Sequence, residues 1–417
     1  MAEYAAFVGL DWADKKHDCC LVDAATGKKE FCVIKHSPQS LQDWASSLYK
    51  RFGGQKVAVS LEQSRGPLIF ALLKYDFLVL YPINPSTLAN YREAFSPSRA
   101  KDDPSDAEYA VDLLIHHHDR LKAWMPDDEK TRTLQYLVEH RRRVVSDRTR
   151  ISNRMTALLK LYSPQVLECF DDIRTDLVCD FLLRWPSLDE VKKVRATTLE
   201  KFFRSHNSVR REGNQQRISS IKAAVALTSD RAVIDSSVVM IRALAAQMKV
   251  AICAIKEFDR QIEQLCATHS DYHLFASLPG SGSVYSSRLL AAFGTNRERF
   301  ESAEEVARLS GIAPVVERSG QSKWVRWRYF CPKFLRQSFQ EYAGESIKHS
   351  FWARAYYSSQ RAKGKSHQAA VRGLAYKWIR IIYRCWQTRS EYDEVKYLEN
   401  LRKKGSPLLS YAANNPQ

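Results

Sequence analysis

The sequence predicts an α/β domain at the N-terminus and a long, mainly helical remainder. Short β-rich runs alternate with helical stretches up to about residue 127, and strand signals disappear from residue 128 onward. The length of 417 residues exceeds one ordinary domain. We therefore expect an α/β domain over 1–127, a helical middle part over 128–268, a mainly helical domain over 269–400 and a flexible tail over 401–417.

The N-terminal strands are predicted from five runs rich in β-branched and aromatic residues, at 6–12, 17–22, 29–34, 57–61 and 77–81. Helical stretches separate or follow these runs, at 39–51, at 67–75, after Asn84-Pro85 and from Pro104 onward. The first three strands are joined only by polar turns, which favours a meander. A three-stranded meander followed by alternating helices and strands predicts a sheet of ribonuclease-H type.

The middle part is predicted from helical periodicity. Residues 131–162 form one long expected helix that carries eight Lys and Arg. Between Ile241 and Leu265, apolar residues recur at alternating spacings of three and four, which is typical of a coiled coil or a helical hairpin. An ordinary amphipathic helix on a globular core is the alternative. The intervening segment, 163–236, is predicted to be a small helical insertion.

Composition indicates the kind of partner and the compartment. Lys and Arg outnumber Asp and Glu by 64 to 47, which gives a formal net charge of +17. Nucleic acid is the commonest partner of so basic a chain. The nine cysteines are scattered without a C-x-x-C pair, which argues against a zinc ribbon and favours free thiols in a reducing cytoplasm. No signal peptide and no membrane partner are expected.

Four carboxylates are candidates for a metal site. Asp11 lies in the first predicted strand, Glu62 ends the fourth, and Asp103 and Asp106 stand at the start of the helix from Pro104. In a ribonuclease-H-like sheet those two strands are neighbours, so the side chains can reach one sheet edge. Convergent oxygen donors suit Mg²⁺ or Mn²⁺, which assist phosphoryl transfer. The alternative is that these residues only end strands and cap a helix.

Two glycine-containing turns mark the C-terminal domain. Leu278-Pro-Gly-Ser-Gly282 precedes a helix and either exposes backbone N–H groups to a DNA phosphate or forms a plain helix–helix turn. Ser319, next to Gly320, is either a common turn residue or an exposed hydroxyl able to attack phosphorus. Basic and aromatic residues interleave after it, and we expect the aromatic rings in the core rather than stacked on bases.

Contacts with nucleic-acid phosphates are expected from a set of cations and turn glycines, namely Lys101, Arg141, Arg142, Arg143, Gly280, Gly282, Arg318, Lys323, Arg326 and Arg328. The run Lys348–Arg384 adds nine Lys and Arg without a single Asp or Glu. Such a run predicts a steep dependence of binding on salt concentration.

Five motifs in order carry a resemblance to a known family. They are Gly9-Leu-Asp11, Glu62 after an apolar strand, Lys101-Asp-Asp-Pro-Ser-Asp-Ala107, Leu278-Pro-Gly-Ser-Gly282, and Gly311-Ile-Ala-Pro through Arg318-Ser-Gly320. With them the chain resembles the DEDD-type transposases of the insertion sequence 110 family, relatives of the Piv invertase that include the bridge-RNA-guided recombinases. The resemblance implies a RuvC-like domain over about 1–125, a helical middle part and a transposase domain over about 268–390.

The resemblance also implies site residues. The family's metal-binding tetrad falls on Asp11, Glu62, Asp103 and Asp106, and its nucleophilic serine falls on Ser319. The family usually has Thr where Asp102 stands here, so Asp102 and Asp103 are alternatives for the third ligand.

The implied reaction is excision and insertion of a mobile element through a transient phosphoserine link, assisted by a divalent metal. The implied partners are donor and target DNA, a structured non-coding bridge RNA, and further copies of the chain, as a homodimer assembling to a homotetramer. In that assembly the RuvC-like domain of one subunit faces the serine domain of another, in the bacterial cytoplasm at the nucleoid. Two other hypotheses remain: a RuvC-like, metal-dependent, structure-specific DNA nuclease that uses water, and a non-catalytic nucleic-acid-binding scaffold.

Overall fold

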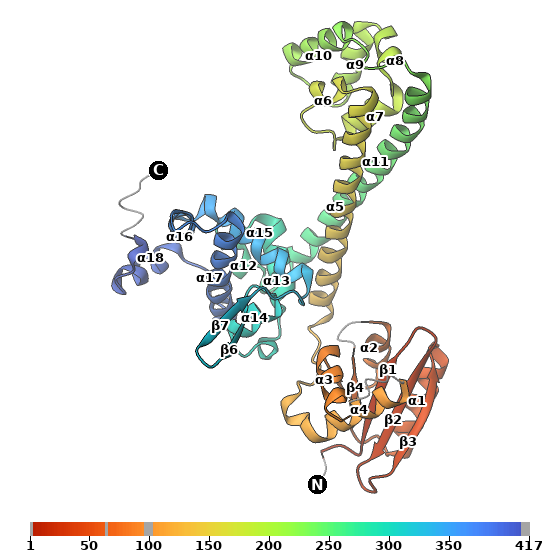
Figure 1. Ribbon diagram of the computed structural model, residues 1–417, viewed down its shortest axis with the longest axis vertical. Helices are drawn as coiled ribbons and strands as arrows, with labels where there is room; N and C mark the ends of the chain where they lie inside the picture. Colours follow the sequence, from red (N-terminus) through yellow and green to blue (C-terminus); the bar gives the residue numbers. More distant parts are fainter. Residues whose placement is uncertain (1–2, 63–65, 96–102, 410–417) are drawn as a thin grey trace. The chain divides into compact units, whose positions relative to one another are not determined.

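A computed structural model of the chain describes residues 3–62, 66–95 and 103–409, with Asp103 described in its backbone only. The chain forms two compact units, Met1–Pro126 and Asp127–Gln417. The first unit is mixed α/β, and the described part of the second is helical apart from one β-hairpin (Figure 1).

The first unit contains a five-stranded sheet. Its strands are β1 (Ala6–Trp12), β2 (Lys16–Asp23), β3 (Lys29–Lys35), β4 (Val57–Leu61) and β5 (Leu78–Pro82). Their order in the sheet is β3-β2-β1-β4-β5. The pairs β1–β2 and β2–β3 are antiparallel, whereas β1–β4 and β4–β5 are parallel. The five predicted strands are confirmed in order, with ends that shift by at most one residue.

Helices cover both faces of this sheet. They are α1 (Pro38–Arg51), α2 (Pro67–Leu72), α3 (Pro85–Phe95), α4 (Asp103–His117) and the 3-10 turn η1 (His118–Arg120). The helix expected over 67–75 therefore ends earlier, at Leu72. The helices α1 and α2 pack against Ala6, Val8 and Leu10 of β1. Because side chains alternate along a strand, Gly9 and Asp11 point to the opposite face, where α4 packs.

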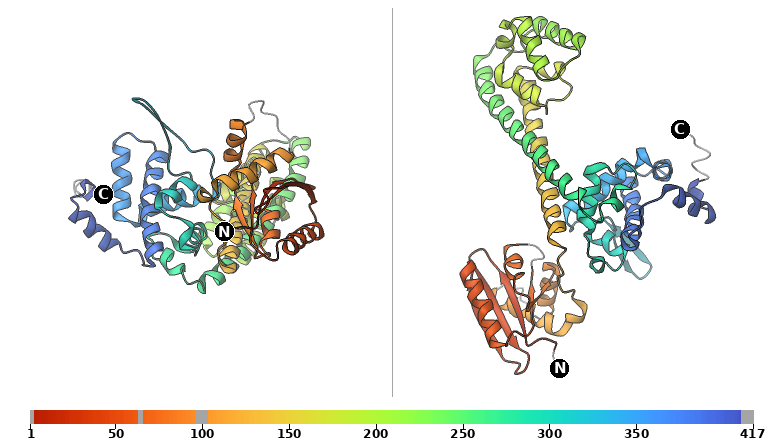
Figure 2. Two further views of the ribbon diagram at one scale, coloured as in Figure 1. Left: turned by 90° about the horizontal axis from the view of Figure 1, so that it is seen from below. Right: turned by 180° about the vertical axis from the view of Figure 1, so that it is seen from behind.

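The second unit is built on a long helical hairpin. Its two arms are α5 (Glu129–Tyr162) and α11 (Arg231–Ala267), which pack side by side (Figure 1 and the right-hand view of Figure 2). Leu134 near the start of α5 shares a core with Ile262 near the end of α11, so the arms are antiparallel. The predicted heptad positions Ile241, Leu244, Met248, Ala251, Ile255 and Ile262 are buried. The helical-hairpin interpretation is therefore confirmed.

A helical insertion joins the far ends of the two arms. Its helices are α6 (Gln165–Cys169), α7 (Asp176–Arg184), α8 (Leu188–Lys193), α9 (Ala196–Ser205) and α10 (Arg211–Ala223). Phe181 and Phe203 form its core together with Leu244 and Met248 of α11. The predicted helical insertion is confirmed, and it buries an apolar core against the ends of α5 and α11.

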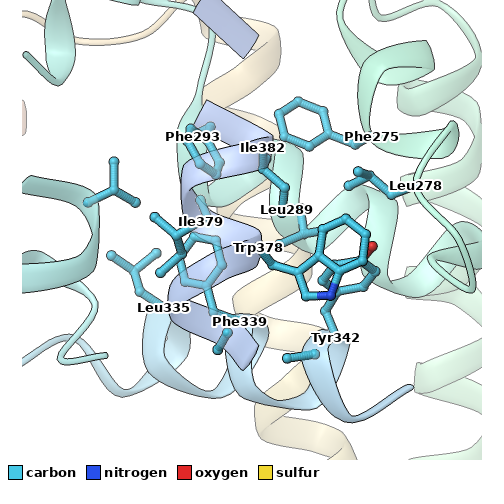
Figure 3. Close-up of a cluster of buried hydrophobic side chains, with 14 of the residues drawn as sticks. Phe275, Leu278, Leu289, Phe293, Leu335, Phe339, Tyr342, Trp378, Ile379 and Ile382 are labelled. Carbon is cyan, nitrogen blue, oxygen red and sulfur yellow. The ribbon is translucent and has the colours of Figure 1, made fainter. Parts of the chain in front are cut away.

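A third group of elements follows the hairpin. It comprises α12 (Tyr272–Ala276), α13 (Gly282–Phe293), η2 (Arg297–Arg299), α14 (Ala303–Leu309), β6 (Val315–Ser319), β7 (Ser322–Arg326), α15 (Lys333–His349), α16 (Phe351–Ala362), α17 (His367–Thr388) and α18 (Glu394–Lys403). Its core surrounds Trp378, which packs among Leu289, Phe339 and Tyr342 (Figure 3). The indole Nε1 of Trp378 donates to Ser346 Oγ at 2.8 Å, so the buried polar atom is satisfied.

Two expectations for this part need correction. The mainly helical prediction for 269–400 misses the antiparallel hairpin of β6 and β7. Almost all of its residues are exposed, so the alternation of apolar and polar residues that marks a half-buried strand is absent. The tail expected to be flexible from 401 begins with the end of α18, and Leu408 packs against the core. Residues 410–417 lie outside the described chain.

Within the described residues, α11 is long and apolar enough to cross a membrane by length and composition. One face of α11 packs into the two cores of the second unit, around Leu244 and around Ile262, whereas Val239, Met240 and Val250 are exposed.

Candidate active site

Two of the predicted carboxylates follow from the parallel pairing of β1 and β4. The register pairs Leu10 with Leu61, so Asp11 and Glu62 are the next residues on the two strands. Adjacent parallel strands lie about 4.8 Å apart, so both residues stand at one edge of the sheet. Both are half-buried. The predicted neighbourhood of the two strands is confirmed.

The third and fourth carboxylates stand on α4, which approaches β1 unusually closely. A Cβ at Gly9 would lie 2.0 Å from the carbonyl oxygen of Ala107, so only glycine fits beneath the helix. The hydroxyl of Ser60 donates to the carbonyl of Ala110 at 2.9 Å, and Ala58, two residues earlier on β4, packs near Leu114. As β4 proceeds, α4 therefore runs in the opposite direction.

This antiparallel course brings the first turn of α4 toward the edge that carries Asp11 and Glu62. The helix begins at Asp103, and Asp106 in the same turn is 3% exposed. Lys101 and Asp102 lie outside the described residues, as does the side chain of Asp103.

A cation that the sequence reasoning missed faces these carboxylates. Arg92 on α3 donates from Nη1 to Asp106 Oδ1 at 2.5 Å. The hydrogen bond to Asp106 raises the pKa of the Arg92 guanidinium, and the charge of Glu62 raises it further. Glu62 and Asp106 therefore act on the same guanidinium. The expectation that could have led to Arg92 is that a group of carboxylates is stabilised by a nearby positive charge.

The donor set suits a hard divalent cation by its chemistry. The side chains are carboxylates, whose oxygens are the ligands that Mg²⁺ and Mn²⁺ prefer. Among the described side chains, which do not include that of Asp103, no three His, Cys, Asp or Glu residues are close enough to hold a metal ion. In this arrangement the positive charge beside Asp106 is supplied by Arg92.

Ser319 ends β6 at the turn of the hairpin. It pairs with Ser322 across a two-residue turn of Gly320 and Gln321. Gly320 has φ of 56°, the positive value that such turns need at their first central position. Ser319 is exposed, and its backbone pairs with Ser322 across the turn. Its side-chain hydroxyl is accessible and is hydrogen-bonded to no other described residue.

The residues beside the serine carry opposed positive charges. Arg318 lies directly across from Lys323, and both are exposed. Like charges directly opposite each other destabilise a two-stranded hairpin. An anionic partner would relieve this repulsion. The neighbouring Arg326 instead pairs with Glu317 at 3.3 Å.

The aromatic residues in and after the hairpin correct the expectation of a buried position. Trp324 is half exposed, Tyr329 is largely exposed and Phe330 is 98% exposed. Trp327 differs, because the guanidinium carbons of Arg336 and Arg372 lie 4.9 and 3.3 Å from its ring centroid. Trp327 thus attaches the base of the hairpin to α15 and α17.

Arg328, the last of the predicted phosphate-binding cations, also holds the base of the hairpin in place. Arg328 donates from Nε to the carbonyl of Ala313 at 3.4 Å. This contact positions the strand that leaves β7.

The predicted glycine turn connects α12 to α13. Gly280 and Gly282 have φ of 71° and 50°. A Cβ at Gly280 would lie 2.4 Å from the His349 ring, so the first glycine is needed for close packing, whereas Gly282 has open space around it. The two predicted glycines therefore differ in role.

The three predicted arginines of α5 also differ from one another. Arg141 makes an ion pair with Asp259 and so connects the arms of the helical hairpin. Arg142 is half-buried beside Arg288, and Arg143 is exposed. Sequence spacing gave no means of separating these three environments.

Comparisons with known proteins agree with both parts of this description. A family model described as "Transposase" matches residues 8–164, and one described as "Transposase IS116/IS110/IS902 family" matches residues 272–358. The chain is therefore a transposase, an enzyme of the class that cleaves and recombines DNA. More particularly, it belongs to the IS110 family of transposases.

Relatives similar over nearly the whole chain support this membership. The "Mini-circle putative transposase for IS117" of Streptomyces coelicolor is 26% identical over 98% of both chains. The "Insertion element IS900 uncharacterized 42 kDa protein" of Mycobacterium paratuberculosis is 23% identical over 93% of this chain and 96% of its own length. The "Insertion element IS110 uncharacterized 43.6 kDa protein" of Streptomyces coelicolor is 22% identical over 94% and 96%.

Proposed function

We propose that the chain excises and inserts a mobile DNA element through a covalent link between Ser319 and DNA. The observation that carries this proposal is the exposed position of Ser319 at the hairpin turn, one residue from the opposed cations Arg318 and Lys323. An exposed hydroxyl can reach a phosphodiester, and the adjacent cations can hold that phosphodiester while charge develops on it.

The first unit is proposed to be a RuvC-like domain of the ribonuclease-H fold. The sheet order β3-β2-β1-β4-β5, with its antiparallel meander and two added parallel strands, supports this assignment. In the proposed division the RuvC-like domain covers 1–127, the helical middle part 128–268 and the serine domain 269–400, followed by the tail 401–417.

The proposed chemistry consists of two exchanges of phosphate esters. The Ser319 oxygen attacks phosphorus, one phosphorus–oxygen bond of the DNA backbone breaks, and the departing DNA strand takes up a proton as a free hydroxyl. The serine proton passes to a base brought by another part of the assembly, since the Ser319 hydroxyl is hydrogen-bonded to no described residue. A hydroxyl of a new DNA end then displaces the serine, so the bond energy is conserved and no ATP is needed.

The carboxylates Asp11, Glu62 and Asp106, with Asp103 or Asp102, would hold Mg²⁺ or Mn²⁺. Such an ion polarises the scissile phosphate and lowers the pKa of an oxygen bound beside it. For the chain's own residues, Asp106 must then exchange its contact with Arg92 for a metal contact. Without the metal, Arg92 neutralises the charge of Asp106.

The proposed partners are donor and target DNA, a structured guide RNA and further subunits, in a homodimer that assembles to a homotetramer in the bacterial cytoplasm. The net charge of +17 and the acid-free run over α16 and α17 support a polyanionic partner of considerable size. Sequencing of the RNA that co-purifies with the protein tests the guide. An RNA whose loops match the element's flanks supports it, and purification with only degraded bulk RNA contradicts it.

The serine link is tested with Ser319→Ala and its matched control Ser322→Ala. Both serines are exposed and stand opposite each other on the same hairpin. The full-length protein is incubated with labelled element-end DNA and Mg²⁺, and protein–DNA adducts are separated on denaturing gels. We expect Ser319→Ala to remove the adduct and Ser322→Ala to retain it.

The carboxylate variant Asp11→Asn separates the nuclease alternative from the transposase. Under the proposed function it removes the adduct without weakening DNA binding. If DNA is still cut by Ser319→Ala but not by Asp11→Asn, then water is the nucleophile and the protein acts as a metal-dependent nuclease. An undiminished adduct in Ser319→Ala would contradict the proposal directly.

A further inference from the structure

The second unit contains a cavity that the proposed chemistry does not use. It measures about 850 Å³ and lies between α5, α11, α13 and α15. This volume is within the range of about 300–1,000 Å³ that is typical of small-molecule sites. Its wall combines apolar side chains with arginines, which include Arg142 and Arg288.

The orientation of α13 determines which of its side chains face the cavity. Leu289 and Phe293 pack into the core around Trp378 (Figure 3). Val284, Ser287 and Arg288 share the neighbouring face, because residues three and four apart lie together on a helix. All three line the cavity.

Arg288 is a buried cation whose hydrogen bonding is incomplete. It is 8% exposed. Its Nε donates to Ser338 Oγ at 3.2 Å and its Nη1 to Glu341 at 2.5 Å. Its Nη2 is buried and has no hydrogen-bond partner in the described chain. A buried charged donor left unpaired is costly, so this atom indicates a missing acceptor.

Arg142 adds a second positive charge to the same wall. Burial lowers the pKa of its guanidinium, and the neighbouring charge of Arg288 lowers it further. Arg142 forms no ion pair with the described residues, and the carboxylate of Glu341 already pairs with Arg288. Asp259 and Glu263 also line the cavity, so its wall carries four arginines against three carboxylates. The remaining positive charge favours an anionic ligand.

The N-terminus of α13 also favours an anionic ligand in this cavity. The first turn begins at Gly282, and Ser283 and Val284 of that turn line the cavity. The N–H groups of a first turn have no partner within the helix and attract anions, phosphate in particular. The helix end and the two arginines thus favour the same ligand chemistry.

The rest of the wall suits a flat organic ring. Val138, Val145 and Ile262 supply apolar surface, and Tyr272 supplies an aromatic ring. A free inorganic anion would leave this surface uncovered. A nucleotide combines a phosphate with a planar base that can pack on such surface.

We propose that this cavity binds one nucleotide unit of a single-stranded nucleic-acid segment, with its phosphate on Arg142, Arg288 and the start of α13. The inference rests on the proposed function only in taking nucleic acid as the partner, because the cavity residues are separate from Ser319 and from the carboxylates. The nucleotide belongs either to the RNA or to DNA, and its phosphate chemistry is the same in both.

The test compares Arg142→Ala with the matched control Arg143→Ala in the full-length protein. The two arginines are neighbours on α5, but only Arg142 lines the cavity. Binding of a labelled single-stranded oligonucleotide is followed by fluorescence anisotropy, with parallel RNA and DNA arms. We expect Arg142→Ala to weaken binding about tenfold or more, as for a lost hydrogen bond to a charged group. We expect a smaller effect, below about threefold, from the exposed Arg143.

A second variant tests the cavity without changing its charge. Val284→Trp on the cavity wall should fill it and weaken oligonucleotide binding to the same extent as Arg142→Ala. Titration calorimetry with UMP, and with inorganic phosphate as a separate probe, should show binding of UMP that both variants lose. A 5-iodouracil oligonucleotide should crosslink to Tyr272, as mapped by mass spectrometry.

The outcomes divide clearly. A preference for the RNA or the DNA arm identifies the source of the nucleotide and supports the site. If Arg142→Ala and Val284→Trp bind oligonucleotide as Arg143→Ala does, the cavity holds no nucleotide and the inference is wrong. If phosphate binds as tightly as UMP, no base is recognised and the nucleotide assignment is wrong. A normal serine adduct in a variant that fails to bind UMP separates this inference from the proposed function.

Discussion

Replacement of Gly9 by alanine should move the carboxylates of the first unit apart. The added Cβ would lie 2.0 Å from the carbonyl oxygen of Ala107 and 2.7 Å from the backbone nitrogen of Val111, whereas ordinary contact begins at 3.4 Å. Both obstructing atoms belong to the backbone of α4, so no side-chain rotation can relieve the clash. The helix must retreat by about 3.4 − 2.0 = 1.4 Å, or β1 must bend.

The consequence reaches the site because α4 carries Asp106 in its first turn, while Asp11 stays on β1. Overpacking of this kind destabilises a fold by about 1–3 kcal/mol. A displacement of about 1 Å in a catalytic constellation lowers the rate by about 100-fold. We therefore expect Gly9→Ala to fold with reduced stability and to lose most of its metal-dependent adduct formation.

The assay combines Mn²⁺ binding followed by electron paramagnetic resonance, adduct formation on element-end DNA, and urea unfolding. The matched control is Gly344→Ala in α15, where an added Cβ meets nothing within 4 Å. That control should raise stability by about 0.5–1 kcal/mol, because alanine is the better helix former. Unchanged Mn²⁺ affinity and unchanged adduct formation in Gly9→Ala would refute the reasoning.

Three further predictions follow from side chains of the second unit. Burial lowers the pKa of His269, so the unfolded state binds a proton at a higher pH than the folded state does. The stability that the neutral ring provides is therefore fully present above about pH 6.5. It is lost as the pH falls through the lowered pKa of the folded state. The fall in urea midpoint between neutral and mildly acid pH should therefore shrink in His269→Gln, and an equal fall in both proteins would contradict the assignment. Lys323→Glu should replace the repulsion between residue 323 and Arg318 by an attraction worth about 0.2–1 kcal/mol. The same variant should bind DNA more weakly and with a smaller salt dependence. Unchanged DNA affinity in an anisotropy titration would show that the hairpin cations make no phosphate contact. Trp378→Ala should destabilise the C-terminal core by about 3–5 kcal/mol. Phe330→Ala, at a 98% exposed position, should change the unfolding free energy by less than about 0.5 kcal/mol. Similar urea midpoints for these two variants would contradict the buried position of Trp378.

Periodic burial is the part of the fold that could be predicted from sequence. The strands of the first unit and the heptads of α11 each bury one regular face, and their residues repeat with the matching period. The hairpin of β6 and β7 buries neither face, so it has no such repeat and was missed. The spacing of the aromatic residues that follow the hairpin predicts a core position, yet Phe330 is exposed.

The candidate site divides in the same way. Asp11 and Glu62 could be brought together from sequence because they end strands that a predictable sheet order makes neighbours. Arg92 could not, since its contact with Asp106 depends on how α3 packs beside α4. Arg142 and Arg143 are adjacent and chemically identical, and only the packing of α5 against α13 gives them different surroundings.

By itself, the sequence determined the types of the elements in the first unit, the long helical hairpin, the basic character of the chain and the residues able to perform phosphate chemistry. These properties are local or periodic, so they can be recognised in a linear chain. The tertiary structure decided which charges are paired, which are exposed and which face a cavity. Those properties depend on contacts between residues that are far apart in the sequence. The pattern of residues along the chain does not show which of these contacts form.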